Sequence, residues 1–282
     1  MIAENECVFA SSSLLFVPGS RPDRFAKARG AGAGLTVIDL EDAVAAGDKA
    51  DARASALAQF ASADTAGWGL RINAIDTAEG ILDLAALIAA DTLPPFLLLP
   101  MVESAVEVEV VAKALGDKCP GLIPLIETPK GLRHAHEIAG ATGNAAMMFG
   151  GGDFSGELGV ELAWEPLLTA RQQFIFACAE HQLPAIDVPF IKLDDEAGLA
   201  EECVRAESIG FDAKAAIHPR QVPAIEEAFE PGEEAVNAAA AALRAYEEAG
   251  EKAIRYKGQM LEAPMVKKYR AVLARKEGKS NA

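Results

Sequence analysis

The chain has 282 residues, of which 51% are hydrophobic and 24% are charged, and its formal net charge is -16 at pH 7. This acidic excess argues against general nucleic-acid binding, because a polyanionic backbone would be repelled. No apolar stretch approaches the ~20 residues of a membrane-spanning helix. We therefore expect a soluble protein with a large core, in which a small anionic substrate needs local cations or a metal.

The cysteines and the first residues indicate a cytoplasmic protein. Cys7, Cys119, Cys178 and Cys203 are scattered and lack the CxxC spacing that is typical of zinc sites, which fits a reducing compartment. The stretch 1–6 is acidic rather than basic, unlike the start of a secretory signal.

Eight short apolar runs alternate with segments that favour helix. The runs are 13–17, 35–40, 68–72, 96–99, 122–126, 146–149, 185–188 and 213–217. Continuous apolar runs are typical of parallel strands that are covered on both faces. The segments 81–90, 105–115 and 199–209 between them are rich in Ala, Glu and Leu. This order predicts an α/β fold, a closed TIM (β/α)8 barrel, which needs ~250 residues; a doubly wound open sheet is the alternative.

The pattern changes after Pro219. Residues 236–250 predict a helix rich in Ala and Glu, and a basic tail follows within 260–282. No low-complexity linker separates these parts. We predict a catalytic barrel over residues 10–230 and a C-terminal helical extension over residues 231–282.

Two acidic residues stand at the ends of successive apolar runs, beside glycine. Glu127 directly follows the fifth run, and Asp153 follows the sixth run after three glycines, the last of which is Gly152. The carboxyl ends of parallel strands line the pocket in α/β proteins, so we expect both acids in one site. Two close carboxylates repel each other unless a divalent metal binds both; the alternative is that each caps a helix. The glycines expose backbone N–H groups suited to a substrate carboxylate, although they could simply form a sharp turn.

Other run ends place charged residues on the same predicted rim. Ser20, Arg21 and Arg24 lie in a turn after the first run, where they suit phosphate groups or are simply solvated. The second run ends in Asp-Leu-Glu-Asp at 39–42, and its three acids need a cation. Arg71, at the end of the third run, is the predicted partner. It would hold a substrate oxygen or form a structural ion pair.

One residue of the eighth run and the residue that follows the run leave further alternatives open. His218 could act in acid–base chemistry, although a lone histidine is more often structural. Lys214 lies inside the run and keeps a covalent aldolase, which forms a Schiff base with its substrate, as an alternative.

Six segments, in order along nearly the whole chain, form a specific combination. They are FVPGSRP (16–22), DLEDAV (39–44), RIN (71–73), IETP (126–129), GDF (152–154) and AIHP (216–219). Together they resemble the motifs of the citrate lyase beta subunit family, within the HpcH/HpaI aldolase and malyl-CoA lyase group. The resemblance implies a TIM barrel, a Mg²⁺ ion held by Glu127 and Asp153, and chemistry at a carbon–carbon bond of a 3-hydroxy-acyl thioester.

The same resemblance assigns roles to the other strand ends. Arg71 would contact the 2-oxo acid product and the thioester oxygen, and Glu41 and Asp42 would orient Arg71. The turn at 20–24, with Ser20, Arg21 and Arg24, would lie near the coenzyme A or acyl-carrier arm.

The segment 258–265 resembles a family motif that usually carries Asp before Pro and that enters a neighbouring subunit's site. Here Glu262 stands where Asp is usual, and catalytic geometry is sensitive to the displacement that an extra methylene causes. The resemblance implies that Glu262 returns a proton to the thioester enolate, or removes one from acetyl-CoA in the reverse direction. It also implies a homo-oligomer, a trimer, in which the extension covers the neighbour's barrel.

We therefore predict a Mg²⁺-dependent carbon–carbon lyase that cleaves a malyl-, citramalyl- or citryl-CoA type thioester to a 2-oxo acid and acetyl-CoA. Glyoxylate, pyruvate and oxaloacetate are all open as the 2-oxo acid. The alternatives are a malyl-CoA-type thioesterase, a carrier-protein-dependent citrate lyase beta subunit, and a non-catalytic metal-binding subunit of a complex.

Overall fold

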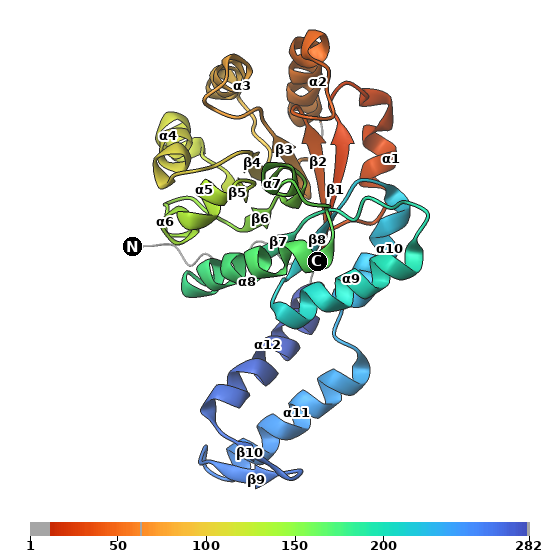
Figure 1. Cartoon of the computed structure of the whole chain (residues 1–282), viewed down its shortest axis with the longest axis vertical. Helices are drawn as coiled ribbons and strands as arrows, with labels where there is room; N and C mark the ends of the chain where they lie inside the picture. The colour runs from red at the N-terminus through yellow and green to blue at the C-terminus, as the bar shows by residue number, and fades with distance from the viewer. Residues whose placement is uncertain (1–11, 63, 281–282) are drawn as a thin grey trace. The chain divides into compact units, whose positions relative to one another are not determined.

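Eight parallel strands form a closed barrel (Figure 1). The computed structural model describes residues 12–62 and 64–280, so Cys7 lies outside the described residues. The strands are β1 (Ser13–Pro18), β2 (Leu35–Asp39), β3 (Trp68–Arg71), β4 (Phe96–Leu99), β5 (Gly121–Ile126), β6 (Met147–Phe149), β7 (Ala185–Asp187) and β8 (Ala213–Ala216). Each strand pairs with the next, and β8 pairs with β1 to close the ring. The predicted TIM barrel is confirmed, and the open sheet is excluded.

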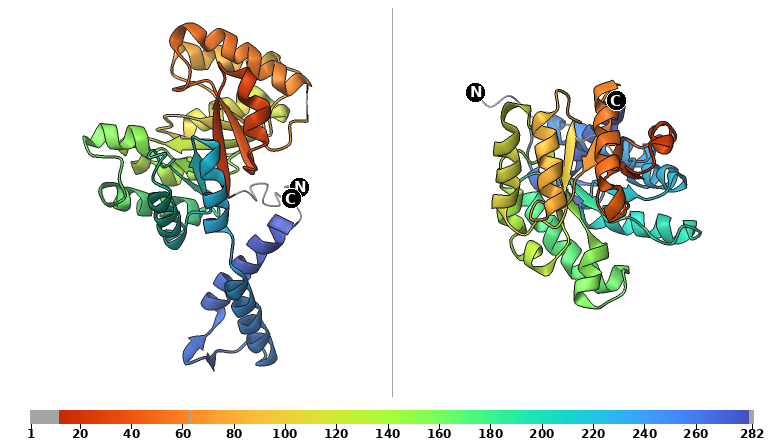
Figure 2. Two further views of the ribbon diagram at one scale, coloured as in Figure 1. Left: turned by 90° about the vertical axis from the view of Figure 1, so that its right-hand side faces the viewer. Right: turned by 90° about the horizontal axis from the view of Figure 1, so that it is seen from above.

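Helices surround the barrel, as the view from above in Figure 2 shows. They are α1 (Phe25–Arg29), α2 (Lys49–Ser62), α3 (Ala78–Ala89), α4 (Ala105–Leu115), α5 (Pro129–Arg133), α6 (Ala135–Ala139), α7 (Gly151–Leu158), α8 (Trp164–Glu180), α9 (Glu196–Ile209) and α10 (Val222–Phe229). Thr77, Thr128 and Asp195 each accept a backbone N–H in the first turn of α3, α5 and α9, so side-chain caps fix where these helices begin. Within the described residues, no helix is both long enough and apolar enough to cross a membrane.

Side chains fill the barrel interior. Alternate residues of the strands point inward, including Leu35 and Val37 of β2 and Ala213 and Ala215 of β8, and all four are buried. Because the interior is packed, it is not a channel, and a ligand site has to lie at one of the two rims.

The residue between two inward-facing alanines of β8 is Lys214, and it points toward the surrounding helices. Its Nζ donates to Asp187 Oδ2 at 2.6 Å, to Glu202 Oε1 at 2.7 Å and to the carbonyl of Val188 at 2.8 Å. Arg171 Nε donates to Asp187 Oδ1 at 2.9 Å. Burial opposes the charge of Lys214, but Asp187 and Glu202 outweigh it and raise the pKa. A lysine so occupied cannot act as a neutral Schiff-base amine, which argues against the covalent aldolase.

The residues from Glu227 onward form a second compact unit. It contains α11 (Glu233–Glu248), an antiparallel hairpin of β9 (Ile254–Tyr256) and β10 (Gln259–Leu261), and α12 (Ala263–Ser280). Its core includes Leu243, Tyr246, Leu261 and Val266. The helix predicted at 236–250 corresponds to α11. The hairpin was not predicted, because its strands have three residues each; its signal is the Lys257-Gly258 turn, where both residues have positive φ.

Replacing Lys214 by Met should lower the free energy of unfolding by roughly 3 kcal/mol or more, because it leaves buried carboxylates without their main cation. Urea unfolding at pH 7 measures the change. Lys113→Met is the matched control: its exposed ion pair with Glu109 should be worth about 0.5 kcal/mol or less. Equal stabilities of Lys214→Met and the wild type would show that the buried network contributes nothing.

Candidate active site

A cavity of about 440 Å³ opens at the carboxyl ends of the barrel strands. Residues at the ends of β1, β2, β3, β5, β6, β7 and β8 line it, and its charged members are Asp39, Asp42, Arg71, Glu127 and Asp153. This rim is where TIM barrels place their active sites. The structure therefore brings together residues from strand ends that lie far apart in the sequence.

Glu127 follows β5, and its side chain is only 4% exposed. Its Oε2 accepts the backbone N–H of Met101 at 2.7 Å. Met101 adopts a left-handed conformation with φ of 55°, which is uncommon outside glycine and aims the N–H at the carboxylate. Burial, with a smaller contribution from Asp153, raises the pKa of Glu127 to about 7 against the opposing effects of Met101 and Arg71. The ionised carboxylate is thus short of positive charge.

Asp153 lies in the first turn of α7, and it shares the cavity wall with Gly152. Burial, followed by the charge of Asp42, raises its pKa. No group of three or more His, Cys, Asp or Glu residues that could hold a metal occurs among the described residues. Two carboxylates fit a Mg²⁺ ion, which is commonly bound by one or two carboxylates and keeps several waters. The donor set therefore suits Mg²⁺ with positions left for water and substrate.

Gly150 allows Glu127 to occupy its position. A Cβ at residue 150 would lie 2.2 Å from Glu127 Cγ, so any other residue would push the carboxylate aside. Gly150 also precedes α7, which carries Asp153, and its N–H donates to the carbonyl of Ile126 at 2.9 Å. One glycine thus couples the two acidic strand ends.

Arg71 is held rigidly at the end of β3. Its Nε and Nη2 each donate to one oxygen of Asp39 at 2.7 Å, and its Nη1 lies 2.8 Å from Glu41 Oε2. The guanidinium also covers the ring of Phe16, with Cζ 4.9 Å from the centroid. Burial opposes its charge, but the bond to Asp39 outweighs burial, so the pKa of Arg71 is raised. This arginine stays protonated and has little freedom to move.

All three acids of the 39–42 segment lie around Arg71, as predicted, but they contact it unequally. Glu41 contacts Arg71, and burial raises the pKa of Glu41 to about 8. Asp42 Oδ2 is 3.8 Å from the guanidinium, and its side chain is 68% exposed, so it is a loose neighbour. The main partner is Asp39, which we did not single out as a site residue. Its position could have indicated this role, since Asp39 is directly opposite Arg71 in the register of β2 and β3.

The turn that follows β1 lies outside the cavity wall. Ser20 is half-buried, whereas Arg21 and Arg24 are exposed. Arg21 binds Asp23 through Nε at 2.8 Å and Nη2 at 2.7 Å. Pro18, just before this turn, does line the cavity. The contact of this turn with the coenzyme A or acyl-carrier arm therefore stays a prediction.

His218 and Glu262 have other surroundings. The Nδ1 of His218 accepts the backbone N–H of Arg220 at 3.2 Å, so this histidine caps a short helical turn, which favours the structural role. Glu262 is exposed and belongs to the second unit. Its carbonyl accepts the N–H groups of Met265 and Val266 at 2.9 and 3.1 Å, so Glu262 stands at the start of α12.

Comparison with known proteins places the chain in a family. The model of the HpcH/HpaI aldolase/citrate lyase family matches residues 12–219. The chain belongs to this family. The resemblance found in the motifs is thereby confirmed.

Individual relatives match over most of their length. The L-malyl-CoA/beta-methylmalyl-CoA lyase of Cereibacter sphaeroides is 31% identical, over 93% of each chain. The (3S)-malyl-CoA thioesterase of the same species is 33% identical, over 84% of this chain and 83% of the relative. The structure of CitE from Mycobacterium tuberculosis with magnesium, acetoacetate and coenzyme A has a TM-score of 0.83 and 32% identity, and it covers 95% of this chain and 98% of CitE.

Gly150→Ala should weaken Mg²⁺ binding by roughly 10-fold or more, because the new methyl group displaces the Glu127 carboxylate. Isothermal titration calorimetry with Mg²⁺ measures the effect. Gly156→Ala in α7, the helix that follows Gly150, is the matched control, since a Cβ there meets no atom within 4 Å. Unchanged affinity in Gly150→Ala would show that Glu127 does not need its present position to bind the metal.

Proposed function

We propose that the protein cleaves a 3-hydroxy-dicarboxylyl-CoA thioester of the malyl-, citramalyl- or citryl-CoA type to a 2-oxo acid and acetyl-CoA. The protein is a carbon–carbon lyase of the HpcH/HpaI aldolase/citrate lyase family. Its cofactor is Mg²⁺, the ion bound in the solved relative. The observation that carries the proposal is the convergence of Glu127, Asp153 and Arg71 on one cavity at the strand ends.

Glu127 and Asp153 are the proposed metal ligands. When bound, Mg²⁺ supplies a Lewis acid for the oxygens of the substrate's hydroxy-acid end. The carboxylate of Glu127 is held in place for metal binding, because one of its oxygens accepts a backbone N–H. Asp153 stands on the more open side, in the first turn of α7. The N–H groups around Gly152 in that turn are the proposed site for a substrate carboxylate, since first-turn N–H groups have no partner within their own helix.

Arg71 is the proposed charge-stabilising residue. Asp39 accepts two of its five N–H donors, and Glu41 Oε2 forms an ion pair with Nη1 at 2.8 Å. We propose that the remaining N–H donors bind the thioester oxygen or the 2-oxo acid. The substrate hydroxyl gives its proton to a water molecule, its oxygen becomes the carbonyl oxygen of the 2-oxo acid, and the bonding pair of the carbon–carbon bond forms the thioester enolate. Arg71 stabilises the negative charge that develops on this enolate. The enolate then takes a proton from a carboxylic acid, for which we propose Glu262.

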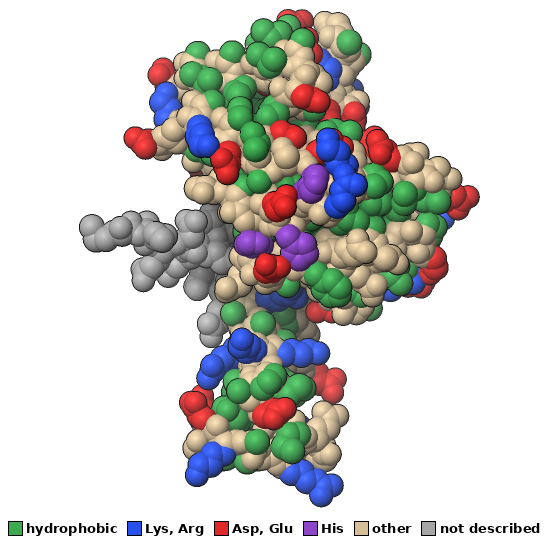
Figure 3. Space-filling model, turned by 60° about the vertical axis from the view of Figure 1, so that its left-hand side comes forward, with side chains coloured by type: hydrophobic (Ala, Val, Ile, Leu, Met, Phe, Trp, Pro, Cys, Tyr) green, Lys and Arg blue, Asp and Glu red, His purple; other side chains and the backbone are tan. Residues whose placement is uncertain are grey.

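We further propose that Glu262 acts on the site of a neighbouring subunit in a homo-oligomer, a trimer. Met260 and Met265, on either side of Glu262, have exposed fractions of 63% and 36%, which favours burial against a partner. Both basic and acidic side chains lie on this unit (Figure 3), and its ten Lys and Arg nearly balance its nine Glu. The support for association therefore comes from the exposed apolar side chains rather than from a net charge.

A thioesterase is the second candidate, because one relative of 33% identity carries that activity in its name. A thioesterase would release free coenzyme A and the hydroxy acid, without a 2-oxo acid. Measuring free thiol and 2-oxo acid in the same reaction separates the two functions. Activity on a carrier-protein thioester alone would favour the citrate lyase beta subunit.

Malyl-, citramalyl- and citryl-CoA should be tested with Mg²⁺ and with EDTA. We expect equal amounts of 2-oxo acid and acetyl-CoA from one of them, only with Mg²⁺. Glu127→Gln should lower kcat by roughly 1,000-fold or more, because a neutral amide is a poor Mg²⁺ ligand. Glu109→Gln, which changes an exposed carboxylate on α4, should retain full activity. Full wild-type turnover in EDTA would contradict the proposal, and absence of turnover with all three thioesters would favour a non-catalytic subunit.

Mixing inactive Glu127→Gln protein with inactive Glu262→Ala protein should restore activity. In a cyclic trimer with random exchange, about one quarter of the sites combine an intact barrel with an intact neighbouring extension. The specific activity should therefore approach a quarter of the wild-type value. Native mass spectrometry verifies that subunits exchange. Mixed trimers without activity, or a wild type that is active as a monomer, would rule out the shared site.

A further inference from the structure

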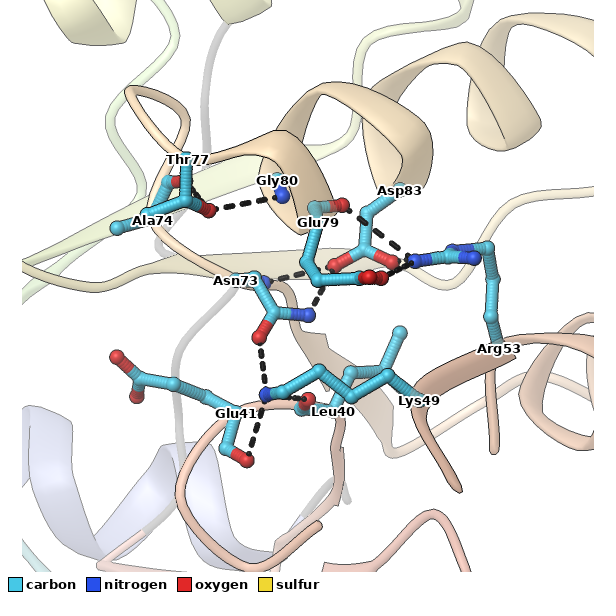
Figure 4. Close-up of polar contacts among 10 residues, drawn as sticks. All are labelled: Leu40, Glu41, Lys49, Arg53, Asn73, Ala74, Thr77, Glu79, Gly80 and Asp83. Atoms are coloured by element: carbon cyan, nitrogen blue, oxygen red, sulfur yellow. Dashed lines mark hydrogen bonds and ion pairs between the residues drawn. The ribbon is translucent and has the colours of Figure 1, made fainter. Parts of the chain in front are cut away.

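The ammonium group of Lys49 lies against the turn that follows β2. Its Nζ donates to the carbonyl oxygens of Leu40 at 2.9 Å and Glu41 at 3.0 Å, and to Oδ1 of Asn73 (Figure 4). An ammonium group has three N–H donors, so these acceptors use all of them. Lys49 is the first residue of α2, and it therefore ties the start of this helix to the ends of β2 and β3.

The same turn is held from its other side by Asp39. The carboxylate of Asp39 accepts the N–H of Glu41 at 2.9 Å and that of Ala43 at 3.2 Å, while both of its oxygens also bind Arg71. The N–H groups of the turn are thus fixed by a carboxylate, and its carbonyl groups are fixed by Lys49. This leaves the backbone of Glu41 little freedom, and its side chain meets Arg71 at 2.8 Å.

Asn73 is a rigid anchor for Lys49. Its backbone N–H and its Nδ2 both donate to Asp83 Oδ2, at 2.8 and 2.7 Å, and Asp83 is 1% exposed. Arg53 Nε donates to the other oxygen of Asp83, and Arg53 Nη2 binds Glu79 at 2.6 Å (Figure 4). Because Nδ2 is committed to Asp83, the side-chain oxygen of Asn73 has to face Lys49.

We propose that Lys49, anchored by Asn73, is a positioning residue for the lyase reaction, because it fixes the turn from which Glu41 reaches Arg71. Lys49 is not among the residues that line the cavity, so it acts through this turn rather than on the substrate. Without the ammonium group, the carbonyls of Leu40 and Glu41 lose their hydrogen-bond donor. The turn then shifts so that water can donate to these carbonyls instead. Glu41 then shifts, and Arg71 loses one of its supports. This inference rests on the proposed function.

The kinetic test uses Lys49→Met, which keeps the apolar stem and removes the ammonium group. We expect kcat to fall by roughly 100-fold, the cost of displacing a catalytic group by about 1 Å. KM for the thioester should stay within about threefold, because uniform binding of the substrate is retained. The kcat of Lys49→Arg should lie between those of Lys49→Met and the wild type, since a planar guanidinium group keeps the charge but cannot reproduce the three hydrogen bonds of the ammonium group. Lys113→Met removes an exposed lysine and should match the wild type.

A second readout does not depend on turnover. Hydrogen exchange followed by mass spectrometry on metal-free protein should show the amides of residues 41–43 exchanging roughly tenfold faster in Lys49→Met than in the wild type or Lys113→Met. Lys49→Gln replaces Lys49→Met if the latter fails to fold. A Lys49 variant with wild-type kcat, or with wild-type exchange at 41–43, would overturn the positioning role. A wild type without lyase activity would instead overturn the proposed function, and the exchange experiment would still decide whether Lys49 holds the turn.

Discussion

The mouth of the barrel depends on the balance between one guanidinium group and the carboxyl groups around it. Asp39 binds Arg71 through both of its oxygens, and Glu41 also contacts the guanidinium group, so Arg71 is already engaged by its own neighbours. Glu127 and Asp153 receive only longer-range support from Arg71, and burial raises the pKa of both. An additional cation beside them would favour the ionised form of both acids. The charge distribution at this rim therefore suits a bound metal ion.

Asp39 connects Arg71 to the turn that follows β2. Its carboxylate binds Arg71 on one strand and the backbone of the following turn on its own strand. A buried charge pair is costly unless hydrogen bonds satisfy its remaining oxygen lone pairs, and the turn supplies them. The guanidinium and the turn thus form one rigid assembly. Its precision comes from the register of two adjacent strands, which does not vary with the conformation of a loop.

The sequence pattern predicted the repeated strand–helix units of the barrel. Eight continuous apolar runs indicate parallel strands, because each strand has to be buried on both faces. The same reasoning placed Glu127, Asp153 and Arg71 at one rim, since the carboxyl ends of parallel strands lie together. It did not reveal that Lys214 faces the helices, because a run buried on both faces does not indicate which residues point inward. Nor did it rank Asp39 above Asp42, since that depends on the pairing of neighbouring strands.

Met101 contacts Glu127 through its backbone, and this has an evolutionary consequence. The bond needs an N–H group in a left-handed conformation and makes no use of the methionine side chain. A residue at this position therefore has to tolerate the left-handed backbone conformation. Asparagine or glycine does so at least as well as methionine. The side chain at this position can therefore change while the contact with Glu127 keeps its geometry. Comparisons that look for invariant side chains would pass over it.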